Sequence, residues 1–193
     1  MGYTKEHREK TRDRILDSAA THFRRDGYDA TRIDDVMAGA GLTRGGFYLH
    51  FDSKADLFAA YVGRELDFGR QLGRAIAQSP DSPVEGVRAA LDFYLAPQNR
   101  KKVAQGCTIV SNAADVARGP LKTRKAFTRS FVEMQAAFEE AAADDADPEG
   151  AALSAIATCV GAVVLGRALA DEATVERLLE ACRENAGRIL GER

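Results

Sequence analysis

Residues 41–54 read GLTRGGFYLHFDSK, and this stretch decides how the N-terminal part of the chain folds. Gly41 offers the positive φ that a sharp turn between two short helices needs. Leu42 and Phe47 are apolar and can hold a short helix over residues 44–50 against the helix that precedes the turn. The stretch therefore predicts a tight turn followed by a short helix.

Two further helices are expected upstream of this turn. A helix over residues 5–25 carries a stripe of apolar side chains and ends before Gly27, a residue suited to terminating a helix. Thr31, with Asp34 three residues later, has the pattern of a capping box and predicts that a second helix begins there and ends near Gly41. Three helices with a sharp turn between the last two form a helix-turn-helix.

A helix-turn-helix presents its last helix to the major groove of DNA, with the N-terminal end of that helix nearest the base edges. Here that end reads Thr43-Arg44-Gly45-Gly46. The guanidinium of Arg44 matches the O6/N7 edge of guanine. Gly45 and Gly46 carry no side chains, which lets the backbone approach the groove closely. Thr43 is expected to cap the helix and to donate to phosphate.

The order and spacing of these residues resemble the recognition segment of TetR-family repressors. The resemblance covers residues from about 10 to 60 and rests on the run Leu42–Phe51, on Ser53, Lys54 and Leu57, and on Gly27–Thr31 with Ile33 and Val36. The sequence departs from the usual pattern at Met37, where alanine is common, and at Arg32, where threonine is commoner. Methionine is flexible enough to pack at such a position. The resemblance implies a dimeric transcriptional regulator that binds a palindromic operator in double-stranded DNA.

The side chains expected to contact DNA lie around the turn and at the start of the fourth helix. Tyr48 and His50 can reach phosphate or a thymine methyl group, although packing or a structural hydrogen bond is an alternative for each. Lys54 suits a phosphate as a cation at a helix N-terminus, and Arg32 could add a phosphate contact. The full set of predicted DNA-binding residues is Thr31, Arg32, Thr43, Arg44, Gly45, Gly46, Tyr48, His50 and Lys54.

The remainder of the chain predicts a helical body. Ser53 with Asp56, and Ser82 followed by Pro83 and Glu85, are strong helix starts. Helices are expected from residue 54 onward and over residues 83–95, 107–118, 121–143, 149–170 and 174–190. The predicted fold is all-α with about nine helices. A helix-turn-helix DNA-binding head covers residues 1–53, and a ligand-binding and dimerisation body covers residues 54–193.

The last two predicted helices have the composition of a dimer interface. The helix over residues 149–170 is rich in alanine and glycine, which lets helix backbones approach closely, and the helix over residues 174–190 has a leucine face. Pairing both helices across a two-fold axis would give a four-helix bundle and a homodimer. An ordinary intramolecular core is the alternative.

The resemblance also implies a small-molecule effector of unknown identity. Ser111 and Asn112 are informative because they are polar within an apolar helix. Aromatic residues of the body could line the effector pocket, or they could occupy ordinary positions in the core. The predicted pocket residues are Phe68, Leu72, Phe93, Tyr94, Cys107, Ser111, Asn112, Phe127, Phe131 and Met134.

Cys107 follows Gly106 at a predicted helix start. This run resembles one TetR subgroup, some members of which sense electrophiles or oxidants through that cysteine. A helix N-terminus, together with Lys101 and Lys102, favours the reactive thiolate. The alternative for Cys107 is a small structural residue.

Composition argues against several other classes of protein. The 27 Lys and Arg against 29 Asp and Glu give a net charge of −2, so only one face of the protein could be electropositive. Three cysteines without framework spacing do not predict disulfides, and three histidines lack metal-ligand spacing. We expect no cofactor, no catalytic grouping, no signal peptide and no membrane partner, and hence a cytoplasmic protein. A helical protein–protein adaptor that has lost DNA binding is the runner-up, and an all-helical enzyme is third.

Overall fold

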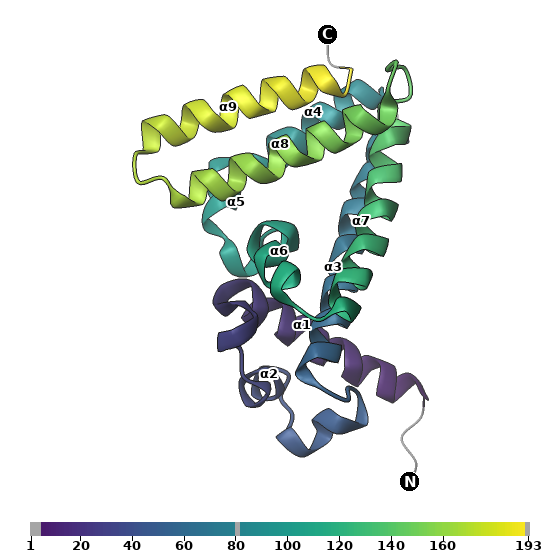
Figure 1. The fold of residues 1–193 in the computed structure, drawn as a ribbon, viewed down its shortest axis with the longest axis vertical. Helices are drawn as coiled ribbons and strands as arrows, with labels where there is room; N and C mark the ends of the chain where they lie inside the picture. The colour runs from purple at the N-terminus through teal and green to yellow at the C-terminus, as the bar shows by residue number, and fades with distance from the viewer. Residues whose placement is uncertain (1–4, 80–81, 192–193) are drawn as a thin grey trace. The chain divides into compact units, whose positions relative to one another are not determined.

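The computed structural model describes residues 5–79 and 82–191, without the side chains of residues 66–77, 83–84 and 99–100. Within these ranges the regular elements are all helices, which confirms the all-α prediction (Figure 1). They are α1 (Lys5–Ala30), α2 (Ile33–Gly39), η1 (Arg44–Leu49), α3 (Lys54–Ala77), α4 (Pro83–Tyr94), α5 (Pro97–Lys101), η2 (Val103–Gln105), α6 (Thr108–Arg118), α7 (Leu121–Ala141), α8 (Pro148–Ala168) and α9 (Glu172–Ile189).

The predicted count of about nine helices is confirmed, with differences in detail. The third predicted helix is η1, a 3₁₀ helix. The short helices α5 and η2 were not predicted, because five and three residues are too few to show an apolar period.

The chain divides into two compact units. Unit 1 consists of Met1–Glu65 with Val103–Thr128, and unit 2 consists of Leu66–Lys102 with Arg129–Arg193. The division falls inside α3 and inside α7, and it joins α6 to the N-terminal helices. This division reflects how the helices pack. The predicted boundary between residues 53 and 54 instead separates the DNA-binding head from the ligand-binding body by function, and it stays a prediction.

Two glycines shape the N-terminal helices, although α1 continues past Gly27 to Ala30 rather than ending at residue 25 as predicted. Gly27 has φ 77° and interrupts the helical geometry of α1, and Gly41 has φ 67° in the turn after α2. The predicted capping box at Thr31 is wrong. Helix α2 begins at Ile33 with Arg32 at its N-cap and no side-chain cap, and the Thr31 hydroxyl donates to the Gly27 carbonyl over 2.7 Å. The helical geometry of α1 is interrupted at Gly27, and the Gly27 carbonyl accepts from the Thr31 hydroxyl. This hydroxyl therefore does not cap α2.

Two other predicted helix starts are confirmed. The Ser53 hydroxyl accepts from the backbone N–H of Asp56 over 3.1 Å and donates to the Asp56 carboxylate over 2.8 Å. The Ser82 hydroxyl accepts from the backbone N–H of Glu85 over 3.1 Å, with Pro83 in the first turn of α4. Each contact satisfies a backbone donor that the helix itself leaves unpaired.

Aromatic rings fill the core of unit 1. Phe23 contacts Phe58 edge-on at a centroid distance of 4.8 Å and Tyr61 at 5.4 Å. Phe47 of η1 is fully buried, as is Met37 of α2. Burying these side chains joins α1, α2, η1 and the start of α3 into one core.

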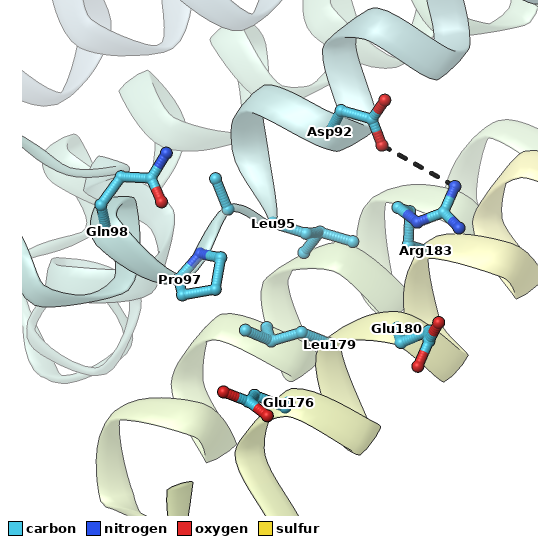
Figure 2. Close-up of a pocket in the computed structure, with 9 residues that line it drawn as sticks. Asp92, Leu95, Pro97, Gln98, Glu176, Leu179, Glu180 and Arg183 are labelled. Carbon is cyan, nitrogen blue, oxygen red and sulfur yellow. Dashed lines mark ion pairs between the residues drawn. The ribbon is translucent and has the colours of Figure 1, made fainter. Parts of the chain in front are cut away.

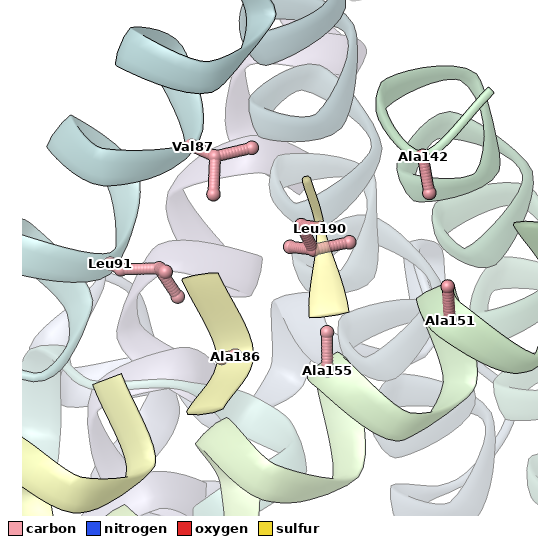
Figure 3. Packing of buried hydrophobic residues seen from close by; sticks show 7 residues of the cluster. All are labelled: Val87, Leu91, Ala142, Ala151, Ala155, Ala186 and Leu190. Carbon is pink, nitrogen blue, oxygen red and sulfur yellow. The ribbon is translucent and has the colours of Figure 1, made fainter. Parts of the chain in front are cut away.

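Small and branched apolar residues fill the core of unit 2 (Figure 3). The cluster consists of Val87, Leu91, Ala142, Ala151, Ala155, Ala186 and Leu190. Helices α8 and α9 pack along each other within this unit. Helix α8 is also long and apolar enough to cross a membrane, with a mean hydropathy of 1.7, but a core helix passes the same test.

Candidate nucleic-acid interface

The short helix η1 has one buried and one exposed side. Phe47 is buried and holds η1 against unit 1, whereas Tyr48 and Leu49 are 60% and 64% exposed. Thr43 and Arg44, at the leading end of η1, are exposed too. Thr43 occupies the N-cap position as predicted, but its side chain forms no cap hydrogen bond. This end of η1 is therefore open to a large partner.

The two glycines of η1 differ in their surroundings. A Cβ added at Gly45 would meet nothing within 4 Å, so the backbone there is open to solvent. A Cβ at Gly46 would lie 3.7 Å from the Met37 Cε, an ordinary contact. Gly45 is thus the position where a missing side chain leaves the most room for an approaching surface.

Arg44 is paired to an acid that sequence reasoning did not consider. Its Nη1 donates to the Asp34 Oδ2 over 2.8 Å, and Arg32 Nη2 lies 4.0 Å from the same oxygen. All three side chains are substantially exposed. No local sequence signal joins Asp34 to Arg44, because the two residues are ten positions apart on either side of a turn.

His50 lies partly inside the unit rather than freely on its surface. Its Nδ1 is buried and has no hydrogen-bond partner among the described residues. Burial lowers the pKa of His50, and the charges of Arg8 and Arg12 lower it further. The neutral ring is therefore favoured at neutral pH. Arg8 itself donates to the Leu49 carbonyl over 2.5 Å, which ties the start of α1 to η1.

Lys54 is the first residue of α3, as predicted. Its ammonium lies 4.5 Å from the centre of the Tyr28 ring and donates to the Asp29 carbonyl over 3.2 Å. Burial lowers the pKa of Lys54, and the Asp29 charge acts in the opposite direction. A phosphate would have to compete with the Asp29 carbonyl for this ammonium.

Thr31 is placed differently from the other predicted contacts. It is only 3% exposed, and its hydroxyl is used by the Gly27 carbonyl. The Thr31 side chain is therefore not available for a DNA contact in this conformation. Gly39 is a position that sequence reasoning missed. A Cβ there would collide with the Ser18 hydroxyl, so its glycine allows α2 to pack closely on α1.

A buried polar network ties α6 to α1 and α3 within unit 1. Asn112 has no exposed surface; its Oδ1 accepts from the Tyr61 hydroxyl over 2.9 Å, and its Nδ2 donates to the Phe23 carbonyl over 2.8 Å. Nδ2 also lies 3.1 Å from Asp115 Oδ2, which accepts from the backbone N–H of Tyr28 over 3.0 Å. These bonds use both Nδ2 hydrogens and one acceptor position of Oδ1, and the side chain is fully buried in this conformation.

A second part of the network surrounds Tyr61. Its hydroxyl lies 3.1 Å from the Thr108 hydroxyl, and Arg24 forms an ion pair with Glu65 beside it. Arg24 also donates to the Ala104 carbonyl over 3.3 Å. Burial raises the pKa of Tyr61 to about 12. Burial thus keeps Tyr61 neutral, although the hydrogen bonds with Thr108 and Arg24 act in the opposite direction, and the network joins α1, α3 and α6.

Unit 2 contains a hollow of about 400 Å³ that the sequence did not predict (Figure 2). Its lining comes from the end of α4, from α5 and from α9: Asp92, Leu95, Ala96, Pro97, Gln98, Glu176, Leu179, Glu180 and Arg183. Arg183 Nη1 lies 3.7 Å from Asp92 Oδ1 across it. The sequence contains little that predicts this hollow, because its lining residues become neighbours only when α9 packs on α4.

Residues 15–61 match the family model described as bacterial regulatory proteins, tetR family. The matched range contains α2, the turn at Gly41 and the whole of η1. These residues belong to the TetR family. The predicted family is thereby confirmed on the segment that carries the exposed η1 surface.

Curated relatives of the chain are named as transcriptional regulators. YfiR, an uncharacterized HTH-type transcriptional regulator of Bacillus subtilis, is 36% identical over 104 residues, which are 49% of this chain and 50% of YfiR. The HTH-type transcriptional repressor BepR of Brucella suis is 36% identical over 125 residues, 60% of each protein. The chain spans about half the length of the curated relatives that it matches.

The fold is shared over most of the chain. The structure of the SmeT–triclosan complex matches with a TM-score of 0.68 and 22% identity, covering 92% of this chain and 90% of that one. At this identity the match concerns the fold alone.

The predicted effector residues belong to both units. Unit 1 contains Cys107, Ser111, Asn112 and Phe127, and unit 2 contains Phe93, Tyr94, Phe131 and Met134. Phe93 is 64% exposed, Met134 is buried, and the other aromatic candidates in the described part of the chain are half-buried. The side chains of Phe68 and Leu72 lie outside the described residues. A common pocket for this set stays a prediction.

Cys107 is the N-cap residue of α6, as its sequence context predicts. It is a half-buried free cysteine. Lys101, which was expected to support its thiolate, belongs to unit 2, where its Nζ lies 3.4 Å from Glu172. Its positive charge is thus partly neutralised by another residue.

Proposed function

We propose that this TetR-family protein is a dimeric, sequence-specific repressor of transcription that a small molecule or a thiol modification releases from its operator. The exposed leading end of η1 carries this proposal. Arg44 projects from it, Gly45 leaves its backbone open, and Phe47 fixes it in the core. A narrow, rigid end of this kind fits a major groove. Such a regulator acts on the chromosome and hence in the cytoplasm.

Dimerisation is supported by the outer side of α8. Leu153, Val164 and Leu165 are exposed apolar residues of this helix. A Cβ at Gly161 would meet nothing within 4 Å, so another backbone could approach closely there. Apolar surface of this kind is covered by a partner in stable assemblies. Two copies related by a two-fold axis would present two η1 ends to a palindromic operator.

Release by a small molecule is supported by the fold neighbour SmeT, which is in complex with triclosan. Repression is supported by the repressor BepR, which shares 36% identity over 125 residues. An effector releases the protein if it binds one conformation more tightly than the operator-binding conformation. In the favoured conformation the two η1 ends would no longer fit successive half-sites.

The function is tested by substituting Arg44. The full chain first selects duplexes from fragments of genomic DNA, and binding of the selected duplex is then measured by fluorescence anisotropy at several salt concentrations. Arg44→Ala should weaken binding by about 2 kcal/mol and relax discrimination at one base pair, because a bidentate contact to guanine is lost. Wild-type affinity should fall by roughly 0.9 log unit per contacted phosphate for each log unit of salt.

Arg25→Ala is the matched control for this measurement. Arg25 is also exposed and also paired with an aspartate, Asp26, at 2.7 Å, but it lies in α1 just before the interruption at Gly27. It should leave discrimination unchanged. A uniform loss across all sequences would make Arg44 a phosphate contact. If wild type shows no saturable binding at low salt, the DNA-binding proposal fails and the adaptor function takes its place.

Thiol regulation is tested at Cys107. N-ethylmaleimide should release the wild-type protein from its operator, and Cys107→Ser should abolish this release without weakening operator binding. Cys182→Ser is the control, because Cys182 is another half-buried free cysteine and burial raises the pKa of its thiol. Continued release of the Cys107→Ser variant would show that Cys107 has only a structural role.

A further inference from the structure

Asp34 and Arg44 face each other across the turn between α2 and η1. Asp34 is the second residue of α2, and Arg44 is the first residue of η1. Their side chains are 39% and 61% exposed and are joined by the 2.8 Å hydrogen bond from Nη1 to Oδ2. Exposed ion pairs add little to the stability of a fold. The main consequence of this pair is therefore the orientation that it gives to Arg44.

The geometry leaves one edge of the guanidinium available. An arginine recognises guanine with two adjacent N–H groups that donate in parallel to O6 and N7. Asp34 holds Nη1, and Nε and Nη2 form an adjacent pair on another edge of the group. Neither of these two nitrogens donates a hydrogen bond within the described part of the chain. Asp34 thus restrains the Arg44 side chain while leaving it a pair of donors for reading a base.

The charge of Asp34 has a separate effect. A carboxylate on a surface that approaches DNA repels the phosphates of every sequence to the same degree. Removal of this charge should therefore strengthen binding to any duplex. Loss of the restraint on Arg44 should weaken discrimination between duplexes. Because the two effects have opposite signs, they can be measured separately.

We propose that Asp34 is a positioning residue for Arg44 and that it sets how well the protein distinguishes its operator from other DNA. This inference rests on the proposed DNA-binding function. Asp34 does not itself contact the base. It acts by limiting the directions in which the guanidinium can donate, so that a guanine at one position is favoured over the other bases.

The test compares Asp34→Asn with Asp35→Asn in the full chain. Asp35 is the next residue of α2, is exposed, and forms no ion pair in the described residues, so its substitution removes the same charge without releasing Arg44. The probes are the duplex that wild type selects from a randomised pool, its single-base variants and a scrambled duplex. Circular dichroism confirms that each variant is folded.

Both substitutions should tighten binding of the scrambled duplex by about 2-fold, because a negative charge is removed. Only Asp34→Asn should reduce discrimination at one base pair, by about 5-fold. In an Arg44→Ala background, Asp34→Asn should reduce discrimination no further, because its effect passes through Arg44.

Three results would overturn the inference: full discrimination by Asp34→Asn, an equal loss in Asp35→Asn, or a loss that persists without Arg44. Failure of wild type to select any sequence would overturn the proposed function together with this inference. That result is recognised before any variant is compared, so the two failures are distinguishable.

Discussion

Unit 1 and unit 2 fill their interiors with different kinds of side chain. The core of unit 1 contains aromatic rings packed on one another and the buried Asn112, whose hydrogen bonds reach α1 and α3. In unit 2, four of the seven residues in the core cluster are alanines. Hydrogen bonds are directional and specify one arrangement of the helices, whereas small apolar side chains mainly specify how closely two helices approach.

This difference suits the two parts of a regulator. In the proposed function the exposed η1 surface reads bases, which requires a support that holds it within a fraction of an ångström. Unit 1 has such a support in its rings and its buried network. Alanine-rich contacts between helices have fewer interlocking side chains, so they permit small sliding movements at low cost. The comparison predicts that polar substitutions matter most in unit 1 and that volume changes matter most in unit 2.

The largest effect is expected for Asn112→Ala. The substitution removes the amide that accepts from the Tyr61 hydroxyl and donates to the Phe23 carbonyl, and it leaves that hydroxyl only its contact with Thr108. The free energy of unfolding in urea should fall by about 3 kcal/mol. Asn185→Ala, at an exposed position of α9, is the control and should change stability by less than about 0.5 kcal/mol. Equal effects of the two variants would refute a special role for the network.

A smaller effect is expected for Ala155→Leu in unit 2. Ala155 is buried between α8 and its neighbours, and a leucine would overfill this space. Stability should fall by about 2 kcal/mol, as is typical of overpacked cores. Ala136→Leu, at an exposed position of α7, should be nearly neutral. If Ala155→Leu were tolerated equally well, the unit 2 core would be looser than its small residues imply.

The smallest effect concerns pH. Burial raises the pKa of Tyr61 to about 12, above its ordinary value of 10. The unfolded chain therefore loses this proton first, so the stability contributed by neutral Tyr61 is present below pH 10 and is lost as the pH rises toward 12. Between pH 9 and pH 11, wild type should lose about 1 kcal/mol more stability than Tyr61→Phe. Parallel losses in the two proteins would contradict a buried neutral tyrosine.

The sequence predicted the helices and turns of the N-terminal segment better than it predicted which side chains contact one another. The turn at Gly41 and the helix start at Ser53 depend on residues close together in the chain, and both are confirmed. Thr31 has the same local pattern as Ser53, but the Gly27 carbonyl takes its hydroxyl. Asn112 was selected as a ligand contact because it is polar in an apolar helix, whereas its partners are distant in sequence and lie inside unit 1.

The sequence by itself determined the helical class, the family and the position of the η1 segment, because helix periods, caps and turn residues act over a few positions. Only the tertiary structure decided which polar side chains already have partners: Arg44 bonds to Asp34 through Nη1, and Asn112 bonds to Tyr61 and Phe23. Such pairs join helices that are separated in the chain, and their bonds depend on fractions of an ångström and on burial. Those quantities arise only when the helices pack.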